Sequence, residues 1–94
     1  EGGAGADTLD GGLGIDTVSY ANSDAKITVY LNGVNFADNI SGGHAEGDLI
    51  KNFENLIGSD FDDEIGGDAG NNVLEGRGGN DYINGFVGND ILLG

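Results

Sequence analysis

The chain has 94 residues, of which 20 are glycine, and 17 acidic residues against three lysine and arginine residues give it a formal net charge of −14. This charge argues against nucleic acid and bare anionic membranes as partners, because both would repel the chain. No apolar run approaches the length of a membrane span, and the absence of cysteine rules out disulfides and thiolate metal sites. Self-repulsion and glycine-rich backbone entropy both oppose folding, so we expect a positively charged partner to stabilise the chain.

Two nonapeptides stand near the amino end: GGAGADTLD at 2–10 and GGLGIDTVS at 11–19. Each has an aspartate in sixth place, Asp7 and Asp16, and an aliphatic residue in eighth place. The last three residues of a unit can form a short strand whose middle side chain points inward. The six residues before them must turn the chain, and glycine permits the positive φ values of tight turns.

A segment of a different kind, residues 20–57, interrupts the repeat. The alternation of aliphatic and other residues over 27–31 predicts a strand with one buried face, and Asn32 with Gly33 predicts a turn after it. We interpret the segment as wider coils of the same solenoid. A separate hairpin pushed out to one side is the alternative.

The end of this segment has features of the repeat. SGGHAEGDLI at 41–50 is a repeat whose loop has gained one residue, which places Asp48 at the position of the sixth-place aspartate. In the following stretch, 52–59, we expect Phe53 and Leu56 to be core residues.

Four further nonapeptides fill 58–93: GSDFDDEIG, GDAGNNVLE, GRGGNDYIN and GFVGNDILL. Their first-place residues are Gly58, Gly67, Gly76 and Gly85, and their sixth-place residues are Asp63, Asn72, Asp81 and Asp90. Two nonapeptides should make one flattened coil of 18 residues with strands on opposite faces, so that units two apart stack on the same side. Stacking would bring sixth-place carboxylates close together, and calcium, which takes about six to eight oxygen ligands in flexible cages rich in carbonyl groups, would relieve their repulsion.

Several residues depart from the repeat pattern, and three of them are large. Phe61 replaces the fourth-place glycine of its unit, which predicts distorted geometry near Asp63, and Phe86 displaces the second-place glycine of the last unit, which affects the site of Asp90. Arg77 also replaces a glycine, and we expect its charge to pair with a nearby acid.

Six units in fixed register match the pattern G-G-x-G-x-D-x-U-x, and the sequence therefore resembles the RTX (repeats-in-toxin) family of secreted bacterial proteins. The resemblance implies an all-β fold, a parallel β-roll or right-handed β-solenoid with a wider-coil insert, in which Ca²⁺ lies between turns. Sixth-place aspartates and loop carbonyls hold calcium in the family, which implies one site at Asp63 with Asp81 and a weaker one at Asn72 with Asp90. The remaining implied ligand residues are Asp7, Asp16, Asp48, Gly58, Gly67, Gly76, Gly78 and Gly85.

The resemblance also implies a function. In serralysin-like proteases and alginate epimerases the repeats form accessory modules, so we expect no catalysis by this chain. We expect a single module, 1–94, from a longer protein, because Glu1 would end one nonapeptide and Gly94 would begin another. Its partners would be calcium and neighbouring domains of a parent chain secreted by a Gram-negative bacterium, unfolded during type I secretion and folded in extracellular calcium. A carbohydrate-binding or substrate-positioning solenoid of a polysaccharide-modifying enzyme is the alternative, and an enzyme is the third hypothesis.

Overall fold

The computed structural model describes residues 8–31, 41–46, 48–51, 53–86 and 88–94, and within them every secondary-structure element except one 3-10 helix is a three-residue strand. The elements are β1 (Thr8–Asp10), β2 (Thr17–Ser19), β3 (Thr28–Tyr30), the 3-10 helix η1 (Gly43–Ala45), β4 (Leu49–Lys51), β5 (Asn55–Ile57), β6 (Glu64–Gly66), β7 (Val73–Glu75), β8 (Tyr82–Asn84) and β9 (Ile91–Leu93). These strands pair in parallel throughout. The all-β, parallel β-roll prediction is therefore confirmed. No helix within the described part of the chain is long and apolar enough to cross a membrane.

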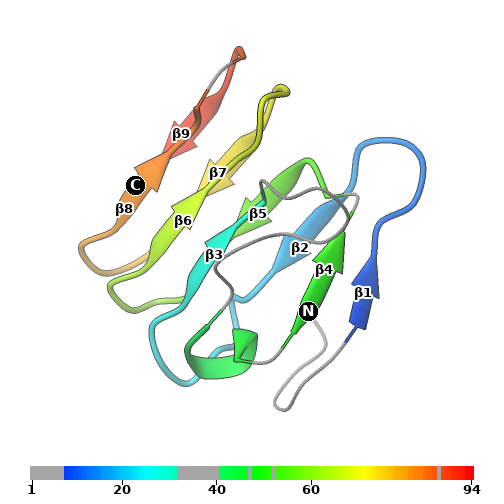
Figure 1. The fold of residues 1–94 in the computed structure, drawn as a ribbon. Coiled ribbons are helices and arrows are strands. Elements are labelled where there is room, and N and C mark those ends of the chain that lie inside the picture. Colours follow the sequence, from blue (N-terminus) through cyan, green and yellow to red (C-terminus); the bar gives the residue numbers. More distant parts are fainter. Residues whose placement is uncertain (1–7, 32–40, 47, 52, 87) are drawn as a thin grey trace.

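From β5 to β9, successive strands alternate between two sheets. One sheet has the order β2-β5-β7-β9, a second has β3-β6-β8, and β1 pairs with β4 (Figure 1). Leu56 pairs with Leu74, and Leu74 with Leu92, so equivalent residues recur two nonapeptides apart. The hydrogen bonds between neighbouring coils confirm this spacing, because they join residues 18 apart. One winding of the roll therefore consists of two nonapeptides.

Eighth-place side chains form the core between the two sides. Leu56, Ile65 and Leu74 are completely buried, and Val18 is 1% exposed. Each such side chain contributes about 1.5–3 kcal/mol by leaving water. Leu92 has the same place in its unit but is 47% exposed, because β9 is the last strand of its sheet.

The segment 20–57 contributes three strands to these sheets. Val29 of β3 pairs with Ile65, and β4 and β5 pair with strands of the amino-terminal repeats. A single antiparallel bridge joins Thr28 to Ser41, and the predicted turn at 32–33 lies outside the described residues. Leu56 is a core residue as predicted, and Phe53 is partly buried against the core.

The predicted alternation in 27–31 holds at Ile27, Val29 and Leu31, which are all buried. Tyr30, on the other face of the strand, is also buried, at 9% exposure. Its ring lies where a side chain would stand on Gly66 of the neighbouring strand. The bare glycine thus gives the tyrosine a place to pack.

Candidate metal centres

The parallel register brings sixth-place residues of neighbouring windings into contact. The backbone N–H of Asp63 donates a hydrogen bond to Oδ1 of Asp81 at 2.9 Å, and the N–H of Asn72 donates to Oδ1 of Asp90 at 2.8 Å. Both pairs expected from the sequence are therefore neighbours in space. Their coordination of calcium stays a prediction at the level of individual residues.

Asp81 is the most unusual carboxylate of the first pair. Its Oδ2 atom is buried and has no hydrogen-bond partner. Burial raises the pKa of Asp81, the negative charges of Asp63 and Asp62 raise it further, and the hydrogen bond from the Asp63 backbone opposes both effects. An ionised carboxylate in this position lacks a compensating charge, and a bound cation would supply it.

Asp63 is buried at 3% exposure but is well satisfied by hydrogen bonds. Its Oδ1 accepts from the N–H of Ile27 at 2.9 Å and from the hydroxyl of Ser59. Its Oδ2 accepts from the N–H of Ser59 at 2.7 Å. These bonds fix the carboxylate beside Asp81, and the lone pair that remains on Oδ2 is able to bind a metal.

The first-place glycines make room for the sixth-place side chains, which fold back over the start of their own units. A Cβ atom on Gly58 would lie 2.7 Å from Oδ2 of Asp63, and one on Gly85 would lie 2.5 Å from Oδ2 of Asp90. The same contact joins Gly67 to Asn72 and Gly76 to Asp81. Glycine is thus required at first place by space rather than by φ. The predicted coordination by its carbonyl oxygen stays a prediction.

The turns between the strands are of two kinds. In the first kind the second-place residue has a positive φ, as in Arg77 at 66° and Phe86 at 61°. In the second kind the second-place side chain accepts a hydrogen bond from the fourth-place N–H, as Ser59 Oγ does from Phe61 at 3.1 Å. Such a turn needs no positive φ at fourth place, and Phe61 has none. Phe61 therefore fits without the distortion that the sequence suggests near Asp63.

The remaining candidate residues have separate surroundings. Asp48 is 3% exposed, and its Oδ2 accepts a hydrogen bond from the hydroxyl of Tyr20 at 2.8 Å. Its register partner would be Asp7, which lies outside the described residues. Gly78 is exposed and lies against the backbone of Asp60. Arg77 forms the expected ion pair, with its Nε 3.0 Å from Oδ1 of Asp60.

Glu54 is an acidic neighbour of Asp16 that the sequence reasoning missed. Its Oε1 accepts a hydrogen bond from the N–H of Asp16 at 2.8 Å, and the register places Thr17 opposite Asn55. Glu54 therefore occupies the sixth place of its winding. The available signal was its spacing, since Glu54 stands two residues before the buried Leu56, but no glycine-rich loop precedes it.

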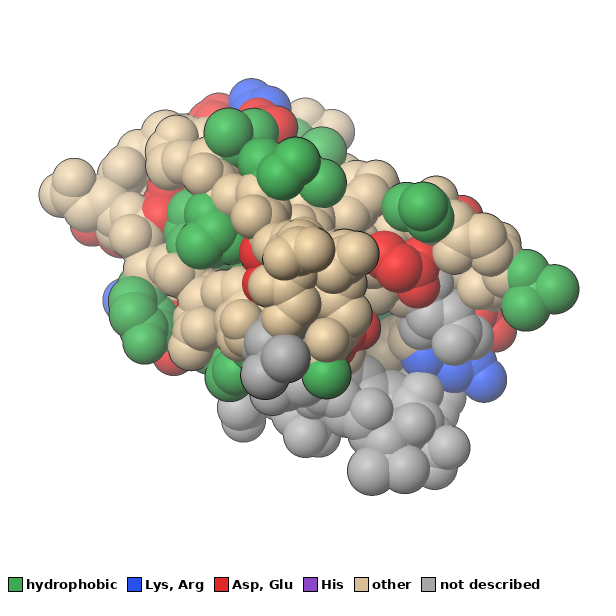
Figure 2. All heavy atoms as spheres, turned by 90° about the horizontal axis from the view of Figure 1, so that it is seen from above, with side chains coloured by type: hydrophobic (Ala, Val, Ile, Leu, Met, Phe, Trp, Pro, Cys, Tyr) green, Lys and Arg blue, Asp and Glu red, His purple; other side chains and the backbone are tan. Residues whose placement is uncertain are grey.

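The donor set fits calcium better than a transition metal. The described residues contain no group of three or more histidine, cysteine, aspartate and glutamate side chains that could hold a metal ion. On the face shown in Figure 2, acidic side chains are spread over several places rather than gathered in one patch. Carboxylates taken in pairs, with backbone carbonyl oxygens to complete the shell, are the hard oxygen ligands that calcium prefers.

Comparison with known families supports this interpretation. A model of the RTX calcium-binding nonapeptide repeat matches residues 1–18 and 57–92 in four copies, which is more than half of the chain. The matched ranges contain the paired residues Asp63, Asn72, Asp81 and Asp90. Comparison with curated proteins gives no match.

Proposed function

The chain belongs to the family of RTX calcium-binding nonapeptide repeats, and we propose that it acts as an accessory module that folds when calcium binds. RTX repeats bind Ca²⁺, so this chain is a calcium-binding β-roll module of the kind found in secreted bacterial proteins. Calcium binds the folded array far more tightly than the unfolded chain, and the binding energy therefore becomes folding energy.

One observation carries this proposal: Oδ2 of Asp81 is buried without a partner beside the acidic Asp63, in a chain whose formal charge is −14. Among the described residues no group forms a hydrogen bond with this atom, and a buried carboxylate without compensation costs folding free energy. A divalent cation removes that cost and joins two windings at once.

The proposal is tested by far-ultraviolet circular dichroism of the chain in chelator and then in millimolar calcium. We expect a disordered spectrum in chelator and a β spectrum after calcium is added. Magnesium at the same concentration is the control, because it demands a smaller octahedral cage and keeps its waters. A complete β spectrum in chelator would refute calcium-driven folding.

The cellular setting follows from the same linkage. RTX repeat proteins are typically secreted by Gram-negative bacteria, and we place this chain in such a protein. In low cytosolic calcium the chain would stay unfolded and pass through a secretion channel, and outside the cell calcium would close the windings. The module would then support a neighbouring domain and perform no chemistry itself. A turnover assay on the isolated chain tests this last point.

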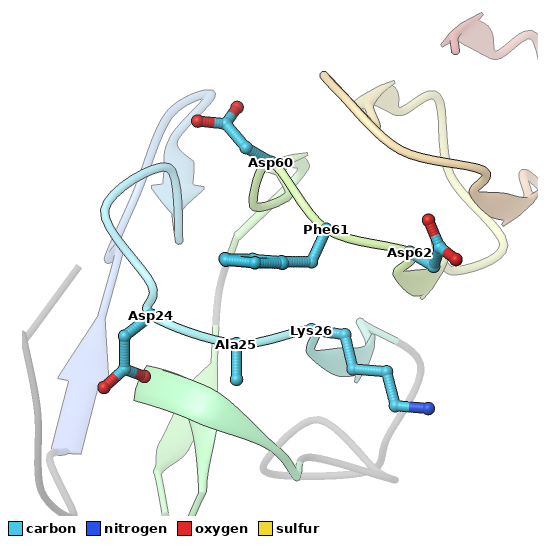
Figure 3. Close-up of a pocket in the computed structure, with 6 residues that line it drawn as sticks. All are labelled: Asp24, Ala25, Lys26, Asp60, Phe61 and Asp62. Atoms are coloured by element: carbon cyan, nitrogen blue, oxygen red, sulfur yellow. The ribbon is translucent and has the colours of Figure 1, made fainter.

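A second candidate function is glycan binding, favoured by an open pocket of about 400 Å³ beside an exposed aromatic ring. The pocket is lined by Asp24, Ala25, Lys26, Asp60, Phe61 and Asp62. In Figure 3 the ring of Phe61 extends over the segment 24–26, with acidic side chains around it. Phe61 is 45% exposed and stands where the repeat has glycine, so the turn itself does not require it.

The polar groups of this pocket are partly held in place. Asp60 pairs with Arg77, and Oδ1 of Asp62 accepts a hydrogen bond from the N–H of Asn80 at 2.7 Å. Fixed carboxylates can accept hydrogen bonds from sugar hydroxyls, and Lys26 can bind a uronate carboxylate. An aromatic face beside such groups suits the apolar side of a sugar ring.

The Phe61→Gly variant tests this second function. It restores the residue of the repeat, and we expect it to fold in calcium while binding alginate oligomers at least tenfold more weakly than the wild type. Tyr82→Ala removes another exposed aromatic residue outside the pocket and should not change the affinity. Equal binding by wild type and Phe61→Gly would exclude the pocket as a glycan site.

A further inference from the structure

The same hydrogen bond recurs at several junctions between windings at sixth place. A backbone N–H in one winding donates to the acidic side chain of the next, as Asp63 does to Asp81. Asp16 and Glu54 repeat this arrangement at 2.8 Å, although Glu54 lies outside the residues matched by the family model. The insert thus supplies an acidic side chain at the position that an aspartate occupies in the regular units.

Asp16 and Asp81 share one structural feature. Among the described residues, only Oδ2 of Asp16 and Oδ2 of Asp81 are buried side-chain oxygens without a hydrogen-bond partner. In both cases a hydrogen bond joins the residue to an acidic residue of the neighbouring winding: the N–H of Asp16 donates to Oε1 of Glu54, and Oδ1 of Asp81 accepts from the N–H of Asp63. Two neighbouring acidic residues, one of them with an unpaired buried oxygen, favour a cation beside that oxygen.

The turn that leads into Asp16 is weakly held by the protein itself. Leu13 is fully exposed and Ile15 is 82% exposed, and a Cβ atom on Gly12 or Gly14 would meet nothing within 4 Å. Figure 1 shows the loop between β1 and β2 extending away from the strands. By contrast, a Cβ on Gly88 would lie 2.5 Å from a carbonyl oxygen of the neighbouring turn. An ion at the base of the 11–15 turn would therefore provide an anchor that packing does not.

We propose that Asp16 and Glu54 form a further calcium site, which joins the amino-terminal repeats to β5 of the insert. The two carboxylates would provide the charge, and carbonyl oxygens of the 11–15 turn with water would complete the shell. The Glu54 carbonyl also accepts a hydrogen bond from the Asn72 side chain, so the site continues the ladder that ends at Asp90. This inference rests on the proposed function, because it assumes that the roll binds calcium between windings.

A purely structural role for Glu54 would be to accept the hydrogen bond of the Asp16 N–H. The Glu54→Gln variant separates the two roles, because the amide oxygen still accepts that bond while the charge is lost. Asp16→Asn removes the other charge in the same way. Glu46→Gln is the matched control, since Glu46 is exposed and accepts a backbone hydrogen bond from Gly42 at 3.1 Å.

The test measures the number of calcium ions bound per chain by equilibrium dialysis, with folding checked by circular dichroism in excess calcium. We expect Glu54→Gln and Asp16→Asn to bind one ion fewer than the wild type, or to bind it at least tenfold more weakly, and Glu46→Gln to match the wild type. Asp81→Asn reports on the regular site. If Asp81→Asn loses an ion while Glu54→Gln and Asp16→Asn lose none, the inference fails and the proposed function stands.

Binding of no calcium by the wild type would overturn the proposed function and this inference together. If a variant does not fold, the wild-type chain provides the test. In that case a crystal structure grown in calcium decides, because the site requires an ion within bonding distance of both Asp16 and Glu54. Water alone between the two carboxylates would overturn the inference.

Discussion

Replacing Asp81 by asparagine should stabilise the folded chain in the absence of calcium and destabilise it in calcium. The substitution keeps the Oδ1 acceptor for the N–H of Asp63 and replaces the unpartnered Oδ2 by an amide group. Asn72 shows how such an amide is satisfied, since its Nδ2 donates to the carbonyl of Glu54 in the preceding winding. The corresponding acceptor for asparagine at 81 is the carbonyl of Asp63, which already accepts from the N–H of Tyr82 at 2.8 Å and has a second lone pair for the amide.

The magnitudes follow from these contacts. A buried polar group without a partner costs about 1–3 kcal/mol, and more when it is charged, so without calcium the variant should be more stable than the wild type by about that amount. Removing a charged ligand weakens the calcium site. At a calcium concentration of 100 times Kd, one site contributes about 2.7 kcal/mol to folding, and the variant loses up to this amount in calcium.

The pH dependence has a defined sign. In the absence of metal, the pKa of Asp81 in the folded state is raised above its ordinary value of 3.8, chiefly by burial. Its contribution to stability is therefore most favourable below pH 3.8 and is lost as the pH rises through the raised folded pKa. In chelator the wild type should gain stability on acidification from neutral pH, and the asparagine variant should gain less.

Urea unfolding in chelator and in calcium measures both effects, with an osmolyte such as trimethylamine oxide added to populate the folded state without metal. The reasoning predicts opposite signs for the change in unfolding free energy under the two conditions. An equal loss of stability in chelator and in calcium would show that Asp81 has only a structural role, and the electrostatic account would then be wrong.

Three further predictions concern the framework around the sites. Gly76→Ala places a methyl group against the sixth-place carboxylate of its unit and should weaken calcium binding with a stability loss of about 1–3 kcal/mol. Gly70→Ala is the control: its methyl group would meet only Oδ1 of Asp68, at 3.3 Å, and it should change calcium affinity little in the same titration. Leu74→Ala should cost about 2–5 kcal/mol in urea unfolding because Leu74 is fully buried, whereas Leu92→Ala, half-exposed at the same place in the next winding, should cost less than about 1 kcal/mol. Burial and a neighbouring glutamate raise the pKa of Tyr30 to about 12. The contribution of Tyr30 to folding stability should therefore be complete below pH 10 and be lost as the pH rises through 12. In a titration followed by tyrosinate absorbance, the Tyr30→Phe variant should lack the transition with the highest pKa.

The regular half of the roll could be predicted from the sequence because its information is local. A period of nine with an aliphatic eighth residue fixes strand length, winding length and the pairing of Asp63 with Asp81 without any long-range data. The same pattern predicts burial of Leu74 and its equivalents, because the eighth-place side chain points to the interior in every unit of nine residues.

The insert could not be read in the same way, because its pairing depends on contacts between residues far apart in sequence. Glu54 becomes a neighbour of Asp16 only through the pairing of β2 with β5, which joins residues 38 apart. Burial of Tyr30 likewise depends on Gly66 in a distant strand. In the turn of Phe61, the hydroxyl of Ser59 replaces the conformational freedom of glycine, a substitution that a pattern based on glycine alone misses.

The back-folded sixth-place side chain has a consequence for how such a sequence can drift over evolutionary time. The second place is occupied by serine, aspartate, arginine and phenylalanine in the four successive units. Serine and aspartate accept a hydrogen bond from the fourth-place N–H, and arginine and phenylalanine adopt a positive φ. No comparable latitude exists at first place, where an oxygen of the unit's own side chain already fills the volume of a methyl group. Diverging nonapeptide units should therefore lose the second-place glycine early and the first-place glycine last. A unit that lacks the first-place glycine should also no longer bind calcium.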